Sequence, residues 1–328
     1  MTGKVKTVLK YLLSLALAAL LLWFAVRSVD WKAFLDGLKL TRWAWLIPFF
    51  AASVGALVFR ALRWMSLLRS SGHRMGWLTV WDANNVGNLA NVAIPGSGEF
   101  LRCGYVAGKN GYGAVFGTIV MERTWDVAAV FLMIILALVL DRAKFGPFFV
   151  EQVWTPLSGR LSFSLWWLFA LLVLALVLFL WAVFRFRERN RFCGKVAGTI
   201  LSIGQGFASF GKMERKGLFL LYTFAIWIMY LLMCFSVLKA IPELSGLSLT
   251  DALFFTAVGN IASVIPVPGG IGAYHYLVAL SVSSIYGGSW ETGLLFATLQ
   301  HELHAILILV LGALSYARLS LRSRNQAA

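Results

Sequence analysis

Charged residues, cysteines and nucleotide-binding motifs are scarce or absent in this chain. Only 13% of its residues are charged, whereas a soluble globular domain has about 25%. The three cysteines share no metal-binding or redox spacing, so we interpret them as small apolar residues. No Gly-x-x-x-x-Gly-Lys-Ser/Thr sequence is present, which excludes a P-loop ATPase or GTPase. These absences argue against a soluble protein and against transport driven by this chain's own ATP hydrolysis.

Apolar residues are abundant instead, and they form long runs. Hydrophobic residues make up 60% of the chain, and the mean hydropathy is +0.79. Runs such as Trp125–Leu140 are typical of membrane-spanning helices. We therefore predict an all-α polytopic membrane protein with six full transmembrane helices, at residues 8–26, 43–66, 113–140, 163–184, 217–239 and 290–316.

Two further apolar stretches, residues 78–107 and 250–286, are interrupted by proline and glycine. Both contain Val-Gly-Asn shortly before the interruption. Proline removes a backbone donor and glycine permits a chain reversal, so we predict that each stretch is a re-entrant helical hairpin. A kinked helix that crosses the membrane once is the alternative. The predicted tips contain Pro95, Gly96 and Gly98 in the first hairpin and Pro266, Pro268, Gly269 and Gly270 in the second.

Basic residues outnumber acidic residues by 29 to 14, and their distribution predicts the orientation of the chain. With both termini in the cytoplasm, most lysines and arginines fall on the inner side, as the positive-inside rule requires. The basic segment 185–216 then lies at the inner surface as an amphipathic linker. We expect anionic membrane lipids, and no nucleic acid, to be the partners of these charges in a cytoplasmic (inner) membrane.

This topology divides a single membrane domain, residues 1–328, into two similar halves. Residues 8–140 hold two spans, the hairpin 78–107 and a third span, and residues 163–316 repeat that order with the hairpin 250–286. Because the halves begin on opposite sides of the membrane, we predict an inverted-topology repeat. Broken segments at corresponding places in such repeats point to the binding site of a transporter.

Five charged residues lie well inside apolar sequence. An isolated charge near the middle of a membrane helix costs about 2.5–3.5 kcal/mol, so these side chains must form ion pairs or line water. We predict one buried network beside the first hairpin tip, which serves either substrate translocation or the structure of the hairpin. Its members are Glu99, Arg102, Glu122, Arg123 and Asp126. Arg60 and Arg63 are interpreted as snorkelling to the membrane surface or as contacts for lipid phosphate.

Polar residues in the second half are fewer. The segment His301–His304 reads His-Glu-Leu-His, which differs from the zinc-protease pattern His-Glu-x-x-His. We predict no metal and no cofactor, and leave open the alternative of a metal held by these two histidines. His275, His301 and Glu302 are candidate headgroup or proton-relay contacts. Asn88 and Asn260, one in each hairpin, are expected to cap backbone groups at the breaks or to contact substrate.

Four elements of the chain form a recognisable set. They are Arg60-x-x-Arg63, Asn91-x-x-x-Pro95-Gly-x-Gly98-Glu99-x-x-Arg102, Glu122-Arg123-x-x-Asp126 and Pro266-x-Pro268-Gly269-Gly270-x-Gly272. This set resembles the lysylphosphatidylglycerol synthase transmembrane-domain family, also called the flippase-like integral membrane family, over residues 8–318. The resemblance implies lipid translocation, with Glu99, Arg102, Glu122, Arg123 and Asp126 as central residues. No soluble synthase domain is present, so we expect that this chain does not make lysyl-lipid itself.

The leading functional prediction is a lipid flippase that moves a phospholipid or lipid-linked headgroup between leaflets by alternating access. A membrane-embedded enzyme acting on a lipid phosphate or lipid-linked sugar is the alternative, and a non-transporting scaffold of envelope synthesis is a third hypothesis. Without a nucleotide site, an ion gradient, a partner protein or the lipid gradient itself must supply the energy. The sequence leaves open whether the chain forms a homo-oligomer or binds an envelope-synthesis partner.

Overall fold

The computed structural model describes residues 23, 29–107, 111–155, 163–188, 190–211, 213–262 and 270–327, and this part of the chain is helical without any strand. The predicted span at 8–26 lies outside the described residues apart from Trp23. Pro266, Pro268 and Gly269 of the second predicted hairpin tip also lie outside them.

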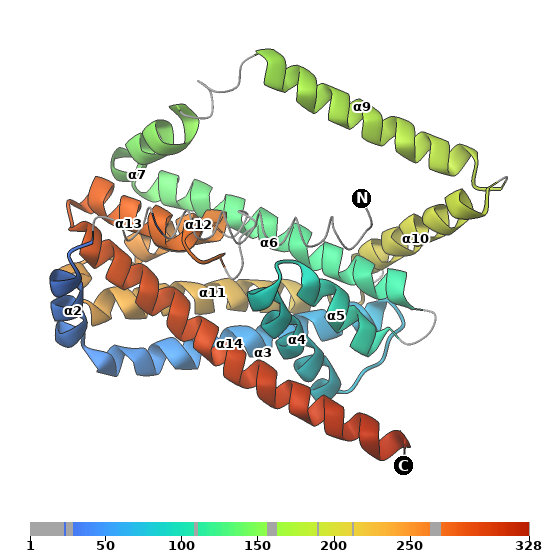
Figure 1. Ribbon diagram of the computed structural model, residues 1–328, viewed down its shortest axis with the longest axis horizontal. Helices are drawn as coiled ribbons and strands as arrows, with labels where there is room; N and C mark the ends of the chain where they lie inside the picture. The colour runs from blue at the N-terminus through green and yellow to red at the C-terminus, as the bar shows by residue number, and fades with distance from the viewer. Residues whose placement is uncertain are drawn as a thin grey trace.

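Four long apolar helices form the body of the molecule (Figure 1). They are α3 (Leu46–Ser70, preceded by the 3-10 turn η1, Trp43–Trp45), α6 (Tyr112–Leu140), α11 (Lys216–Ala240) and α14 (Trp290–Ala327). Each contains a stretch long and apolar enough to cross a bilayer. Four of the predicted spans are thereby confirmed, and the protein is an all-α, multi-pass membrane protein.

A further helix, α9 (Phe163–Arg185), coincides with the predicted span at 163–184. In Figure 1 it meets α10 (Arg191–Phe207) at one end and otherwise stands apart from the bundle. Among its described side chains, Leu171 and Trp181 are 63% and 60% exposed. Large apolar side chains exposed along a helix of a membrane protein are expected to face lipid. Within the segment 185–216, α10 packs against α6.

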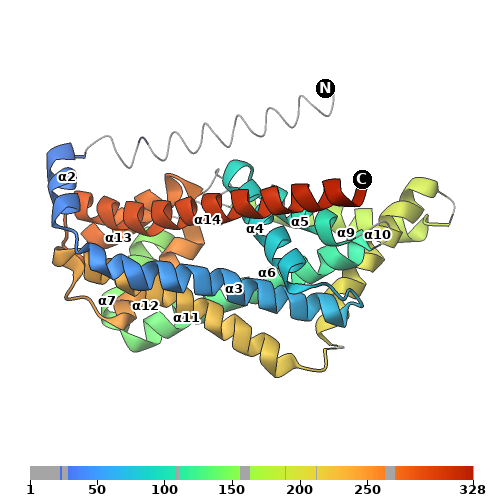
Figure 2. The same cartoon turned by 90° about the horizontal axis from the view of Figure 1, so that it is seen from below.

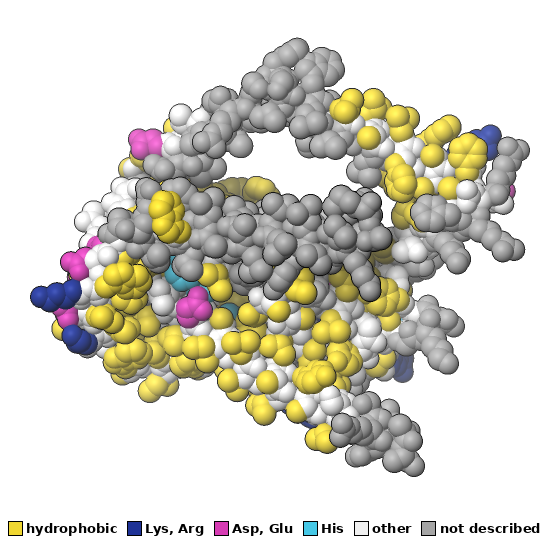
Figure 3. Space-filling model, viewed as in Figure 1, with side chains coloured by type: hydrophobic (Ala, Val, Ile, Leu, Met, Phe, Trp, Pro, Cys, Tyr) yellow, Lys and Arg dark blue, Asp and Glu magenta, His cyan; other side chains and the backbone are white. Residues whose placement is uncertain are grey.

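Exposed hydrophobic side chains also cover the long helices. Phe131, Leu132 and Val139 of α6, for example, are all largely exposed. Figure 3 shows hydrophobic side chains over much of the coloured surface of one face, and lysine, arginine and acidic side chains at the end near α2 (Trp31–Leu40). This distribution suits a protein whose sides meet acyl chains and whose ends meet water.

The two interrupted stretches each form a pair of shorter helices. The first pair is α4 (Trp77–Ala93) and α5 (Ser97–Val106), and the second is α12 (Leu249–Ala262) and α13 (Ala273–Tyr286). The helices of each pair pack on one another. Figures 1 and 2 place the two pairs toward opposite ends of the long helices.

The turn between α4 and α5 closes through glycine and asparagine residues. Gly96 has φ +79°, in the left-handed region that glycine adopts without a steric penalty. Just beyond it, Gly98 lies directly against the carbonyl group of Gly87, so the two helices of the pair are in backbone contact. The backbone N–H of Gly98 donates to Asn91 Oδ1 at 2.7 Å. The side chain of Asn91 therefore satisfies one of the free donors at the start of α5.

Each hairpin packs against the opposite half of the chain. Helix α4 contacts α14, whereas α12 contacts α6, and α3 packs along α11. The helix pairs therefore join residues 8–140 to residues 163–316.

Short elements complete the described part of the chain. They are α7 (Arg142–Phe148), the π-helical turn η2 (Phe149–Trp154), and the 3-10 turns η3 (Ala208–Phe210) and η4 (Pro242–Leu244). Helix α7 is held to α12 by the stacked rings of Phe145 and Phe254, whose centroids lie 4.4 Å apart in the main hydrophobic core. This stacking fixes the second hairpin against the segment that follows α6.

Candidate functional site

Buried arginines from α3 and α5 converge on the acidic face of α6. Arg102 Nη2 lies 2.8 Å from Glu122 Oε2, and Arg63 Nε lies 3.6 Å from Glu122 Oε1. Arg63 Nη1 also lies 2.7 Å from Asp126 Oδ1. Glu122 and Asp126 are four residues apart and so lie on one face of the helix. Arg63 therefore bridges two successive turns of α6, while Arg102 attaches the first hairpin to it.

Arg123 extends this network toward the first hairpin tip. Its Nη2 lies 3.0 Å from Glu99 Oε1, and its Nη1 lies 3.5 Å from Asp126 Oδ2. Asn91 Nδ2 also contacts Glu99 Oε1, at 3.4 Å. The five residues that the sequence singled out therefore lie in one continuous network, and Arg63 joins them as a sixth charged member.

One end of the network is deeply buried. Arg63, Arg102 and Glu122 are 1%, 3% and 3% exposed. Arg102 Nη1 also donates to Asn84 Oδ1 at 2.9 Å, and its guanidinium lies over the ring of Trp64 at 4.7 Å. The interpretation that Arg63 snorkels is wrong, because the nearby carboxylates of α6 hold its guanidinium inside the bundle.

The network is electrically balanced, with three arginines facing three carboxylates. Balance is what allows so many charges to remain inside a low-dielectric interior. A balanced network attracts a phosphate only weakly through its net charge. An additional cation is therefore needed for the site to attract an anion.

Arg60, one turn before Arg63 on α3, supplies such a cation. It lines a cavity of about 850 Å³ and forms no salt bridge within the described part of the chain. The same cavity is reached by Glu99 and Arg123, the less buried end of the network.

Both hairpins contribute to the wall of this cavity. From the first come Asn88, Asn91, Pro95, Gly96 and Glu99, and from the second come Thr256, Gly259, Asn260, Gly270 and Tyr274. Helix α14 adds Gln300, His301, Glu302 and His304, and α11 adds Tyr230. The segments that the sequence marked as broken therefore meet around one space, although they are far apart in the chain.

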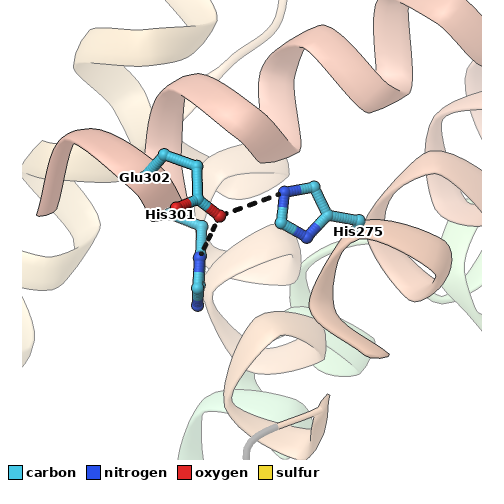
Figure 4. Close-up of side chains that lie close together, drawn as sticks. All are labelled: His275, His301 and Glu302. Carbon is cyan, nitrogen blue, oxygen red and sulfur yellow. Dashed lines mark hydrogen bonds and ion pairs between the residues drawn. The ribbon is translucent and has the colours of Figure 1, made fainter. Parts of the chain in front are cut away.

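Three titratable side chains gather at the second-hairpin side of the cavity (Figure 4). Glu302 Oε1 lies 3.0 Å from His301 Nδ1 and 3.6 Å from His275 Nε2. His275 belongs to α13 and the other two to α14, so the carboxylate lies between rings from two helices. The ring of Tyr274 lies 5.2 Å from that of His301.

The two candidate asparagines have different surroundings. Asn88 is buried at the cavity wall, and its Nδ2 has no hydrogen-bond partner among the described residues. Asn260 Nδ2 donates to the carbonyl oxygen of Thr256 at 2.8 Å, within its own helix. At the first turn it is Asn91, rather than Asn88, that binds the backbone.

Sequence reasoning missed the contact of Asn84 with Arg102 and the contacts of Asn91 with Gly98 and Glu99. The signal was present, because Asn84, Asn88 and Asn91 recur at spacings of four and three in α4 and so share one helix face. An asparagine face on an apolar helix indicates polar partners inside the bundle.

Asp251 anchors the start of the second hairpin. Its carboxylate accepts hydrogen bonds from Lys144 Nζ at 2.6 Å, from Tyr286 at 2.8 Å and from the backbone N–H of Ser248 at 2.8 Å. Burial of Asp251 favours the neutral acid, but these hydrogen bonds outweigh it and hold the pKa of this carboxyl below its usual value. The contacts tie α7, α12 and α13 together away from the cavity.

Comparison with known proteins identifies the family of the chain. The sequence profile described as the lysylphosphatidylglycerol synthase TM region matches residues 11–312. No curated protein and no solved structure gives a significant match. The matched range includes α3, α6 and α11, both hairpins, the whole charged network and α14 as far as residue 312. The chain therefore belongs to the lysylphosphatidylglycerol synthase TM region family.

Proposed function

We propose that this protein moves a phospholipid or lipid-linked headgroup between leaflets. The observation that carries the proposal is the cavity of about 850 Å³ lined by both hairpins, by Arg60 and by the cavity end of the ion-pair network. Its size falls within the range of about 300–1,000 Å³ found for small-molecule sites. The charged and polar side chains in its wall lower the large desolvation cost that otherwise keeps a charged headgroup out of the membrane interior.

The roles of the charged residues follow from their burial. Arg60 and Arg123 contact the headgroup phosphate, while Arg63, Arg102 and Glu122 hold the first hairpin on α6. Glu99 is a counter-ion for Arg123, and the lipid phosphate replaces it when substrate enters. Asn88, Asn260, His275, His301 and Glu302 contact the polar parts of the headgroup, with the second hairpin shaping the path.

The proposed motion is a rocking of two inverted halves around the cavity. Support comes from the repeated order of elements: a long helix, a hairpin and another long helix occur as α3–α6 and again as α11–α14. The reciprocal packing of α4 on α14 and of α12 on α6 links each hairpin to the opposite half. We propose that both hairpins are re-entrant, from opposite faces of the inner membrane, and that both termini are cytoplasmic.

The proposal predicts lipid exchange by the purified protein. In proteoliposomes that hold a fluorescent phospholipid in both leaflets, a membrane-impermeant quencher should remove more than the outer-leaflet share of the signal. Arg60→Gln should slow the exchange by about tenfold or more, because a hydrogen bond to a charged group is worth about 1.5–3 kcal/mol. The matched control is Arg69→Gln, on the same helix but exposed and outside the cavity wall, which should exchange lipid like the wild type.

Three other results would count against the proposal. Equal rates for Arg60→Gln and the wild type would remove Arg60 from the path. A chemically altered lipid on a chromatogram would favour a membrane-embedded enzyme. Neither exchange nor a new product, for several headgroups and with an imposed proton gradient, would favour a scaffold of envelope synthesis.

A further inference from the structure

The cluster of His275, His301 and Glu302 has the composition of a transition-metal site. Two imidazoles and one carboxylate offer three ligand atoms, all within 4.8 Å of one another. Two histidines and one glutamate are a ligand set that binds catalytic zinc, with a fourth position open. The sequence pattern did not reveal this set, because its third member comes from a different helix.

The distances between the ligand atoms also suit a tetrahedral ion. Bonds of about 2.0–2.2 Å at tetrahedral angles place neighbouring ligand atoms about 3.3–3.6 Å apart. In this cluster Glu302 Oε1 lies 3.0 Å from His301 Nδ1 and 3.6 Å from His275 Nε2. Two of the three separations are therefore close to tetrahedral values, and Figure 4 shows the Glu302 oxygen facing both rings.

His275 provides an independent reason to expect a ligand. The residue is only 4% exposed, and its Nδ1 has no hydrogen-bond partner among the described residues. Its Nε2 lies 3.6 Å from Glu302 Oε1, which is too long for a hydrogen bond. An ion on Nε2 supplies the partner that this nitrogen lacks among the described residues, while Nδ1 keeps the ring proton.

We propose that His275 Nε2, His301 Nδ1 and Glu302 Oε1 bind one divalent transition-metal ion, with zinc as the best match. Imidazole nitrogen and carboxylate oxygen are ligands that zinc accepts. His301 and Glu302 both line the cavity, so the open position of the ion faces it. Three ligands with one negative charge leave a divalent ion with net charge +1, which adds to Arg60 in attracting an anion.

The use of the open position rests on the proposed function, whereas metal binding does not. If a lipid phosphate enters the cavity, one of its oxygens can take the fourth position, with Arg60 nearby. Metal binding is therefore tested first, in detergent and without added lipid.

The test uses the full-length protein, stripped of metal with a chelator and titrated with Co²⁺ and then Zn²⁺. We expect the visible absorption of tetrahedral Co²⁺, one bound zinc per chain by elemental analysis, and a zinc-dependent rise in melting temperature. Glu302→Gln and His275→Gln conserve size and should each weaken binding at least tenfold, the loss seen even for outer-shell changes. His304→Gln is the matched control, on the same helix and cavity wall but outside the cluster, and should bind like the wild type.

Several results would overturn the proposal. One is the absence of stoichiometric Co²⁺ and Zn²⁺ in a wild-type protein that is monodisperse on gel filtration. Another is equal binding by the wild type, both cluster variants and His304→Gln, which would place the ion elsewhere. Gel filtration and the metal-free melting temperature show whether a variant has lost its fold. If His275→Gln does not fold, the metal affinity of Glu302→Gln is used as the test.

A second arm separates this site from the transport proposal. Lipid exchange is measured in proteoliposomes with chelator and with zinc. Exchange that zinc accelerates in the wild type but not in Glu302→Gln supports a metal that contacts the substrate. Metal binding without any lipid exchange would refute the proposed function and leave the metal site standing.

Discussion

Replacing Glu122 by glutamine should destabilise the protein by about 3–5 kcal/mol, the range for removing one partner of a buried ion pair. Glu122 is 3% exposed and lies between Arg102 and Arg63. Its loss leaves Arg102, itself 3% exposed, with only the neutral contacts of Asn84 and Trp64. Unfolding in mixed detergent–SDS micelles, followed by tryptophan fluorescence, measures the difference in free energy.

A matched control and a double variant isolate the cause. Asp36→Asn makes the same chemical change in the exposed pair with Lys39 and should change stability by less than about 1 kcal/mol. Removing both buried charges, in Arg102→Met with Glu122→Gln, should be less destabilising than the sum of the single changes. Wild-type stability of Glu122→Gln would mean that the carboxylate is not needed to balance the arginines.

Replacing Gly98 by alanine should prevent the first hairpin from closing, with a loss of about 3 kcal/mol or more, at the upper end of overpacking effects. A Cβ at this position would meet the carbonyl oxygen of Gly87 and lie 2.7 Å from Asn91 Cγ. The Gly87 carbonyl oxygen belongs to the backbone, so it cannot rotate out of the way of the Cβ. The variant should show a lower melting temperature, and the native Cys103 of α5, which is buried in the closed hairpin, should react faster with a cysteine reagent than in the wild type.

Gly104 provides the control for this change. It lies in the same helix, and a Cβ there would meet nothing within 4 Å. Gly104→Ala should be neutral or slightly stabilising, since alanine favours a helix over glycine by about 0.5–1 kcal/mol. If Gly98→Ala were as stable as Gly104→Ala, the close contact between α4 and α5 would not be needed for the fold.

The two predictions separate structural from functional parts of the site. Glu122 and Gly98 hold the first hairpin in place, so their variants should lose protein rather than lose transport selectively. Arg60 lines the cavity and does not hold a hairpin, so its variant should lose transport in a stable protein. This separation of roles follows from burial, because Arg63, Arg102 and Glu122 are buried and do not line the cavity. We therefore expect them to serve the fold.

Features with a local cause could be predicted from the sequence alone. Long apolar runs specify helices that span a bilayer, because no other local structure satisfies the backbone there. The Pro95-Gly96 break specified an interruption, since proline stops a helix and glycine accepts the left-handed turn that follows. Charges inside apolar runs required partners, because an unpaired charge is costly there.

Which partners those charges have was decided only by the tertiary structure. Arg63 and Asp126 are 63 residues apart, and no local pattern distinguishes an arginine that snorkels from one that a carboxylate on another helix holds. His275 meets His301 and Glu302 only because α13 packs on α14. Helix periodicity places a residue on a face of its own helix, but packing decides what that face meets. The membrane helices, the breaks and the need for ion pairs follow from local sequence, whereas the particular pairs, the histidine cluster and the shared cavity follow from how the helices pack.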